Sequence, residues 1–165
     1  MRPIPPEAVR ASFLNISVRE RKSIVLPPDF DSLDWNQLDY LGWHDPKLPQ
    51  VGYVVVELDG EPTGILLRQA ERAPRARAQC SWCEDVRLPN PVIFFSVKRA
   101  GEAGRRGNTV GTLACAGFEC SRNVRTRPAM AYVGFDIEAE RLRRIAALAE
   151  HVTAFVQNVR DGGED

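Results

Sequence analysis

The four cysteines of the chain fall into two close pairs whose spacing suits a metal site. Cys80 and Cys83 enclose two residues, and Cys115 and Cys120 enclose four. Two thiolates a few residues apart on a tight turn direct their sulfur atoms to one point, and a second pair brought back by folding completes a tetrahedron. Four thiolates also fill the coordination sphere of zinc, which leaves no open position for water or substrate. The spacing therefore predicts one structural Zn²⁺ ion held by Cys80, Cys83, Cys115 and Cys120.

The segment between the two pairs has the pattern of a β-hairpin that returns the chain to the metal. Residues 91–97 are rich in β-branched and aromatic side chains, residues 101–107 have the glycines of a turn, and residues 108–114 form a second strand. After the second cysteine pair, residues 121–127 form a short polar run that a proline follows, which favours a short helix ending there. A knuckle, a hairpin and then a helix with the last ligands is the order of elements in a treble-clef zinc finger.

The sequence leaves alternatives open for these cysteines: two disulfides, four unrelated buried thiols, or another metal such as iron at the same ligands. The first seven residues contain no apolar signal segment and no small-residue cleavage site. We therefore expect a cytoplasmic protein in a reducing compartment, where disulfides are rare.

The residues around the cysteines resemble a known family. The run from 80 to 90, the segment from 105 to 112 and the second cysteine pair look like the C-terminal treble-clef finger of the elongation factor G-binding proteins. That family includes fusidic acid resistance proteins of the FusB type, which bind the translocase and help release it from the ribosome. The resemblance is confined to about residues 80–127. It implies a translation factor or the ribosome as partner, and only the four zinc ligands match residue by residue.

Charge is distributed unevenly along the chain, although the net charge is zero. Residues 71–127 carry eleven basic and five acidic side chains (net +6), whereas residues 1–70 and 128–165 each have a net charge of −3. A positive segment between negative ones can attract nucleic acid or an acidic protein surface. We expect one partner-facing surface, with RNA as the alternative to a translation factor; its residues are Arg105, Arg106, Arg122 and Arg125. The competing interpretation is that these are ordinary solvated arginines.

The remaining segments predict two further short helices and a second hairpin. Residues 5–15 have apolar side chains at helical spacing, and the aromatic-rich residues 31–42 suit a short helix that packs into the core. Residues 52–58 and 61–68 flank an Asp-Gly pair, which is typical of a two-residue hairpin turn. The small and basic residues 70–78 are expected to be a linker or a helical lead-in to the first cysteine pair.

The clearest pattern is a long amphipathic helix over residues 136–160, with Asp136 as N-cap and Gly162 after its end. Its apolar stripe must be buried, by default on the sheet. The expected fold class is α+β: antiparallel β-hairpins, a four-cysteine treble-clef finger and this helix. We expect an N-terminal helix and hairpin region at 1–70 and the finger with the C-terminal helix at 71–165, or alternatively one continuous domain with a single sheet.

The sequence contains no recognisable catalytic motif. It has no Gly-rich phosphate loop, no nucleophile elbow and no His-Glu-x-x-His, and its two histidines are far apart. No apolar stretch reaches the roughly 18 to 20 residues of a membrane span. We therefore expect a protein that is not an enzyme, with no membrane or small-molecule partner, that binds a translation factor or the ribosome. RNA binding is the second possibility, and an enzyme whose site the sequence does not reveal is the third.

Overall fold

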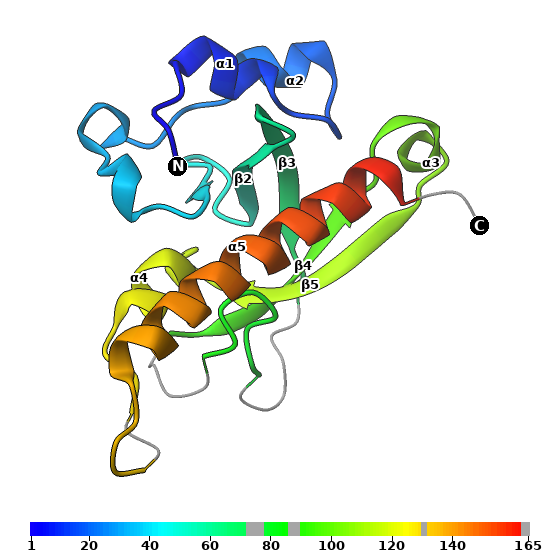
Figure 1. Cartoon of the computed structure of the whole chain (residues 1–165). Helices are drawn as coiled ribbons and strands as arrows, with labels where there is room; N and C mark the ends of the chain where they lie inside the picture. The colour runs from blue at the N-terminus through cyan, green and yellow to red at the C-terminus, as the bar shows by residue number, and fades with distance from the viewer. Residues whose placement is uncertain (72–77, 86–89, 130–131, 163–165) are drawn as a thin grey trace.

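The computed structural model describes residues 1–71, 78–85, 90–129 and 132–162, and its centre is one five-stranded antiparallel sheet (Figure 1). The strands follow chain order across the sheet: β1 (Leu41–His44), β2 (Val51–Leu58), β3 (Glu61–Gln69), β4 (Val92–Lys98) and β5 (Thr109–Cys115). Both expected hairpins, β2–β3 and β4–β5, are present. They join because Arg68 and Gln69 of β3 pair with Ser96 and Phe95 of β4. All five strands therefore belong to a single sheet. The division of the chain into regions 1–70 and 71–165, with one continuous domain as its alternative, stays a prediction.

The turn between β2 and β3 has the backbone that its Asp-Gly sequence predicts. Asp59 and Gly60 have φ values of 55° and 83°, the left-handed pair that a tight hairpin turn requires. Every residue of β2 except Glu57 is buried. A strand buried on both faces needs a cover on each side of the sheet.

One layer of short helices covers one face of β2 and β3, and one long helix covers the other (Figure 1). Tyr53 and Val55 of β2 pack in a cluster with Val9 and Phe13, which come from α1 (Pro6–Ala11) and the residues after it. The alternate residues of β2, Val54 and Val56, belong to a second cluster with four buried side chains of α5 (Ile137–Asp161); these are Leu148, Val152, Val156 and Val159. The period-two alternation of strand side chains thus divides the core into two clusters.

The long helix forms as the sequence predicts. The Asp136 side chain accepts a hydrogen bond from the Ala139 N–H at the start of α5, and Gly162 follows its last residue. Its stripe packs on the sheet, as expected. Within the described residues, no helix combines the length and apolar character that crossing a bilayer requires.

The aromatic segment 31–42 is not the expected single helix. It contains two 3₁₀ turns, η1 (Phe30–Ser32) and η2 (Trp35–Gln37), and then enters β1. The Asp34 side chain accepts a hydrogen bond from the Asn36 N–H and so caps η2. The residues from Leu41 onward form a strand because they pair with β2. The aromatic residues of the segment nevertheless pack inward, with Tyr40 only 2% exposed and Trp35 half-buried.

Three smaller segments also differ in detail from the sequence expectation. The expected helix at 5–15 ends at Ala11, and a second helix, α2 (Val18–Ser23), follows with Ser17 and Glu20 as a capping box. The expected turn at 101–107 contains α3 (Gly101–Arg105). The expected linker at 70–78 lies mostly outside the described residues.

Candidate functional site

The four cysteines meet at one point in the structure. Cys80 and Cys83 lie on the turn before β4, Cys115 ends β5, and Cys120 begins α4 (Cys120–Arg125). All four sulfur atoms lie within 4.8 Å of one another, with Sγ–Sγ distances of 3.7 Å for Cys80–Cys120 and for Cys83–Cys115. A tetrahedron with Zn–S bonds of about 2.3 Å has edges of about 3.8 Å. The donor set therefore fits one structural zinc ion.

The distances also exclude two of the alternatives for these thiols, a pair of disulfides and four unrelated buried thiols. A disulfide needs an S–S distance of about 2.05 Å, and all four cysteines are free. Their clustering sets them apart from unrelated buried thiols, since each is at most 6% exposed and all face one centre. Such a closed set of four thiolates suits a structural metal.

Two N–H groups point at the sulfur atoms and complete the surroundings of the site. The Asn123 side-chain amide lies 3.4 Å from Cys115 Sγ and 3.9 Å from Cys83 Sγ, and the backbone N–H of Trp82 lies 3.4 Å from Cys80 Sγ. Asn123 is only 2% exposed. N–H donors stabilise the negative charge of thiolates and orient them. The role of Asn123 was not predicted from the sequence; the signal for it is a polar residue three positions after Cys120, on the same side of α4.

The electrostatics of the cluster call for a cation. Hydrogen bonding with Cys115 lowers the pKa of the Cys80 thiol and raises that of Cys120, because adjacent sulfur atoms cannot all carry charge. Burial raises the pKa of Tyr40 well above its ordinary value. Tyr40 therefore remains a neutral donor, and its hydroxyl donates to the Phe118 carbonyl at 3.2 Å. Zinc would neutralise the charge that this packing concentrates.

The N-terminal part of the chain contributes directly to the walls of the metal centre. Asp39 forms a two-pronged ion pair with Arg125 of α4, at 2.5 and 3.0 Å, and its N–H donates to Ser121 Oγ. The ring of Phe118 lies over Gly52 of β2, where an added Cβ would come within 2.6 Å of the ring. The finger is thus docked on the first two strands.

The four arginines expected to form one surface are not brought together. Arg105 and Arg106 lie at α3, Arg122 and Arg125 lie on α4, and these helices sit at opposite ends of α5 (Figure 1). The seven residues of β5 span about 23 Å, which carries the hairpin tip away from the metal. Arg125 is largely buried against Asp39, and Arg106 pairs with Glu102. Arg105 and Arg122 are exposed, and partner contact by any of the four stays a prediction.

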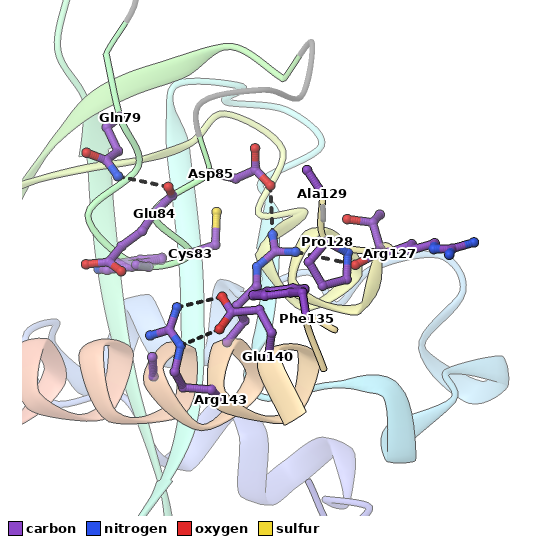
Figure 2. Close-up of a pocket in the computed structure, with 14 residues that line it drawn as sticks. Gln79, Cys83, Glu84, Asp85, Arg127, Pro128, Ala129, Phe135, Glu140 and Arg143 are labelled. Atoms are coloured by element: carbon purple, nitrogen blue, oxygen red, sulfur yellow. Dashed lines mark hydrogen bonds and ion pairs between the residues drawn. The ribbon is translucent and has the colours of Figure 1, made fainter. Parts of the chain in front are cut away.

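A hollow of about 670 Å³ adjoins the metal centre beside Cys83 (Figure 2). Its charges nearly cancel, because Arg143 pairs with Glu140 at 2.7 Å and Arg144 pairs with Asp85 at 2.8 Å. Among the described residues, its charged lining consists of Glu84, Asp85, Arg127, Glu140, Arg143 and Arg144. At its margin, Phe135 packs edge-on against Tyr132, whose side chain is 66% exposed. This end of the molecule thus combines exposed arginine and aromatic groups.

Comparison with known proteins extends the likeness well beyond the finger. Among solved structures, that of the fusidic acid resistance protein FusC is similar in fold, with a TM-score of 0.57 and 18% sequence identity. The match covers 92% of this chain and 58% of the FusC chain, so this chain spans little more than half of that protein. A comparison with curated protein sequences gives no match.

A family model settles the relationship. The model described as the FBP C-terminal treble-clef zinc-finger matches residues 8–159, and not merely the expected 80–127. The wider match agrees with the structure, in which the first two strands and the segment before them form part of the wall of the metal centre. With the match running through the sheet, the four cysteines and the long helix, the chain belongs to the FBP C-terminal treble-clef zinc-finger family.

Proposed function

We infer that this protein is a non-enzymatic zinc-finger protein that binds a translation factor of the elongation factor G type, alone or on the ribosome. The observation that carries the proposal is the family match over residues 8–159, because the cysteine region resembles the elongation factor G-binding proteins. The likeness to FusC supports the fold, and that protein is described as a fusidic acid resistance protein. The proposal is limited to binding, since this chain spans 58% of FusC.

Zinc has an architectural role in this proposal. Cys80, Cys83, Cys115 and Cys120 would hold the ion, and the Asn123 amide would support the thiolate charge. When bound, the ion cross-links the turn before β4, the end of β5 and the start of α4. Binding energies of structural zinc are about 10–16 kcal/mol, enough to fix these three segments relative to one another. The ion thereby keeps the surrounding surface in one shape.

The surface at the metal end of α5 is the best candidate for the contact with the factor. We define the finger surface as Arg122, Arg127, Tyr132 and Val133, all of which are exposed. Val133 is 100% exposed and Tyr132 is 66% exposed. Tyrosine and arginine are enriched among the residues that dominate protein interfaces. Of the four arginines expected from the sequence, Arg122 belongs to this surface.

Biolayer interferometry with purified elongation factor G tests both the partner and the surface. The zinc-loaded wild type is compared with Arg122→Glu/Arg127→Glu, which reverses two charges without touching the metal ligands. Arg19→Glu/Lys22→Glu is the matched control, because it makes the same charge change on exposed residues of α2. We expect at least tenfold weaker binding for the finger variant, a loss of about 1.4 kcal/mol or more. The control should bind like the wild type.

Two results would contradict the proposal at different levels. If zinc-loaded wild type shows no saturable binding to elongation factor G, free or ribosome-bound, the assigned partner is wrong. If both double variants bind as tightly as the wild type, the partner stands and the finger surface is wrong. Retention of zinc by each variant, measured by metal analysis, separates these results from loss of the fold.

A further inference from the structure

A second hollow, of about 530 Å³, lies far from the metal, between β3, β4, α3 and the segment that leads into α2. We call it the basic groove. Its charged lining residues are Glu20, Arg68, Lys98, Arg99 and Arg105. The groove lies near the C-terminal end of α5, since the Arg99 guanidinium donates to the Asn158 carbonyl and side-chain oxygen at 2.6 and 2.8 Å.

The groove exists because β3 and β4 separate. They pair at Arg68 with Ser96 and at the neighbouring position, and the side chain of Asn15 then bridges the strands. Its amide donates to the carbonyls of Leu66 and Lys98, and its oxygen accepts from the Leu66 N–H, each at 2.9 Å. One asparagine thus satisfies the backbone groups that the opened ladder exposes. The groove is a built feature of the sheet.

Positive charge exceeds negative charge among the described residues that line the groove. Arg68, Lys98 and Arg105 are exposed, and among residues 1–71, 78–85, 90–129 and 132–162 no ion pair engages any of them. Glu20 is the one carboxylate among the described residues of the lining, and its oxygen is already bonded to the N–H and hydroxyl of Ser17. The hollow beside the metal differs, because its arginines face an equal number of carboxylates among the residues that the structure describes.

The three exposed cations of the groove come from three different elements: Arg68 from β3, Lys98 from β4 and Arg105 from α3. Hydrogen bonds from Ser17 lower the pKa of Glu20, and the charges of Arg68 and Lys98 lower it further, so both cations lie close enough to act on one carboxylate. Arg105 is brought in by α3, which lies tightly against the preceding backbone at Gly104. A Cβ at Gly104 would come within 1.8 Å of the Arg99 carbonyl oxygen, so only glycine permits this approach.

We propose that the basic groove binds the phosphodiester backbone of RNA. Three unpaired cations and the hydroxyls of Ser96 and Thr109 line it, which are the groups that contact phosphate oxygens. No aromatic ring is found among the described residues that line the groove, so it offers no platform for stacking a base. Binding is therefore independent of base sequence. This site is separate from the finger surface and does not depend on the proposed translation-factor partner.

An acidic protein segment is the main competitor for the groove. A protein partner draws most of its affinity from apolar and aromatic anchors that enter pockets. Within the described part of the chain, the apolar lining of the groove is limited to the half-buried aliphatic side chains of Leu14, Ile16 and Leu66. Phosphate binding, by contrast, needs only cations and hydrogen-bond donors. The composition of the groove therefore favours the polyanion.

The test is fluorescence anisotropy with a labelled oligouridine of about 12 nucleotides, a length within the range of single-strand sites. Arg68→Gln/Lys98→Gln neutralises two groove cations that make no hydrogen bond or ion pair in the described structure. Lys22→Gln/Lys47→Gln is the control, since it removes the same charge from exposed side chains outside the groove. On α2, Lys22 points about 200° away from Glu20, which lines the groove.

We expect the groove variant to bind the RNA at least tenfold more weakly at low salt. The slope of log affinity against log salt should become shallower by about 1.4, because each lost phosphate contact on a single strand contributes about 0.7. The control should keep the wild-type slope, and oligoadenosine of equal length should bind like oligouridine.

Three outcomes overturn the proposal. In the first, wild type does not bind RNA at low salt. In the second, both double variants lose affinity and slope equally, which would indicate general charge attraction. In the third, a polyglutamate peptide binds more tightly than RNA and loses its affinity in the groove variant, which would assign the groove to an acidic protein. None of these outcomes bears on binding of elongation factor G through the finger surface.

Discussion

Removing Asp39 should destabilise the protein far more than removing an exposed partner of an ion pair. The side chains of Asp39 and Arg125 are 7% and 18% exposed and meet through two hydrogen bonds. Asp39→Ala would leave the Arg125 guanidinium mostly buried, with the Ser121 carbonyl as its remaining acceptor. Breaking a buried pair typically costs 3–5 kcal/mol, and because water reaches part of Arg125 we expect about 3 kcal/mol.

Urea unfolding at saturating zinc, followed by circular dichroism, measures this loss. With an m-value of about 2 kcal/mol/M, a loss of 3 kcal/mol lowers the midpoint by about 1.5 M. Arg106→Ala is the matched control, because its pair with Glu102 has side chains 72% and 65% exposed and should contribute less than about 0.5 kcal/mol. The double variant Asp39→Ala/Arg125→Leu should recover much of the loss, since the stranded charge is gone. A loss below about 1 kcal/mol for Asp39→Ala would refute this reasoning.

Three further predictions concern the metal and the sheet. Asn123→Leu removes the amide that faces Cys115 Sγ and should lower zinc affinity by about 10- to 100-fold, measured by competition with a chromogenic chelator. Stripping the ion with a strong chelator should abolish the cooperative unfolding transition of the finger in a calorimetric scan. Desolvation raises the pKa of Asp45, but hydrogen bonds from two backbone N–H groups and the Tyr53 hydroxyl outweigh it, so the net shift is downward. Ionised Asp45 therefore stabilises the folded state above about pH 4, and this stabilisation is lost as pH falls through the lowered pKa. The difference in unfolding free energy between wild type and Asp45→Asn should decrease over that range.

Local patterns explain which elements could be predicted from the sequence. The cysteine spacing, the Asp59–Gly60 turn and the apolar stripe of α5 are each encoded within a few neighbouring residues. Both hairpins and the long helix therefore appear where the sequence expects them. The β1 strand was not predicted, because its buried and half-buried side chains alternate over only four residues and its formation depends on pairing with β2. Its helix-like aromatic spacing was overridden by a partner ten residues further along the chain.

The four arginines that were expected to form one surface are not close together, and the contacts that separate them involve residues far apart in the sequence. The residues next to Arg125 in the sequence do not indicate that its guanidinium forms an ion pair with Asp39, 86 residues earlier. The length of β4 and β5 likewise places Arg105 beside Arg68 and Lys98, in a groove formed where β3 and β4 separate. Segment charge predicted that this region would be basic. Only the sheet topology shows that its exposed cations are divided between two sites.

The division has a consequence for how the two proposed activities would combine. Arg144, which bonds to the end of α4, and Asn158, which bonds to Arg99 beside the groove, are 14 residues apart on α5, or about 21 Å. The helix thus separates the finger surface from the basic groove, so a partner bound at one surface would not exclude a partner at the other. If RNA and the factor belong to one assembly, occupation of the groove raises the effective concentration of the finger surface near the factor. The groove variant would then weaken binding to ribosome-bound factor while leaving binding to the free factor unchanged.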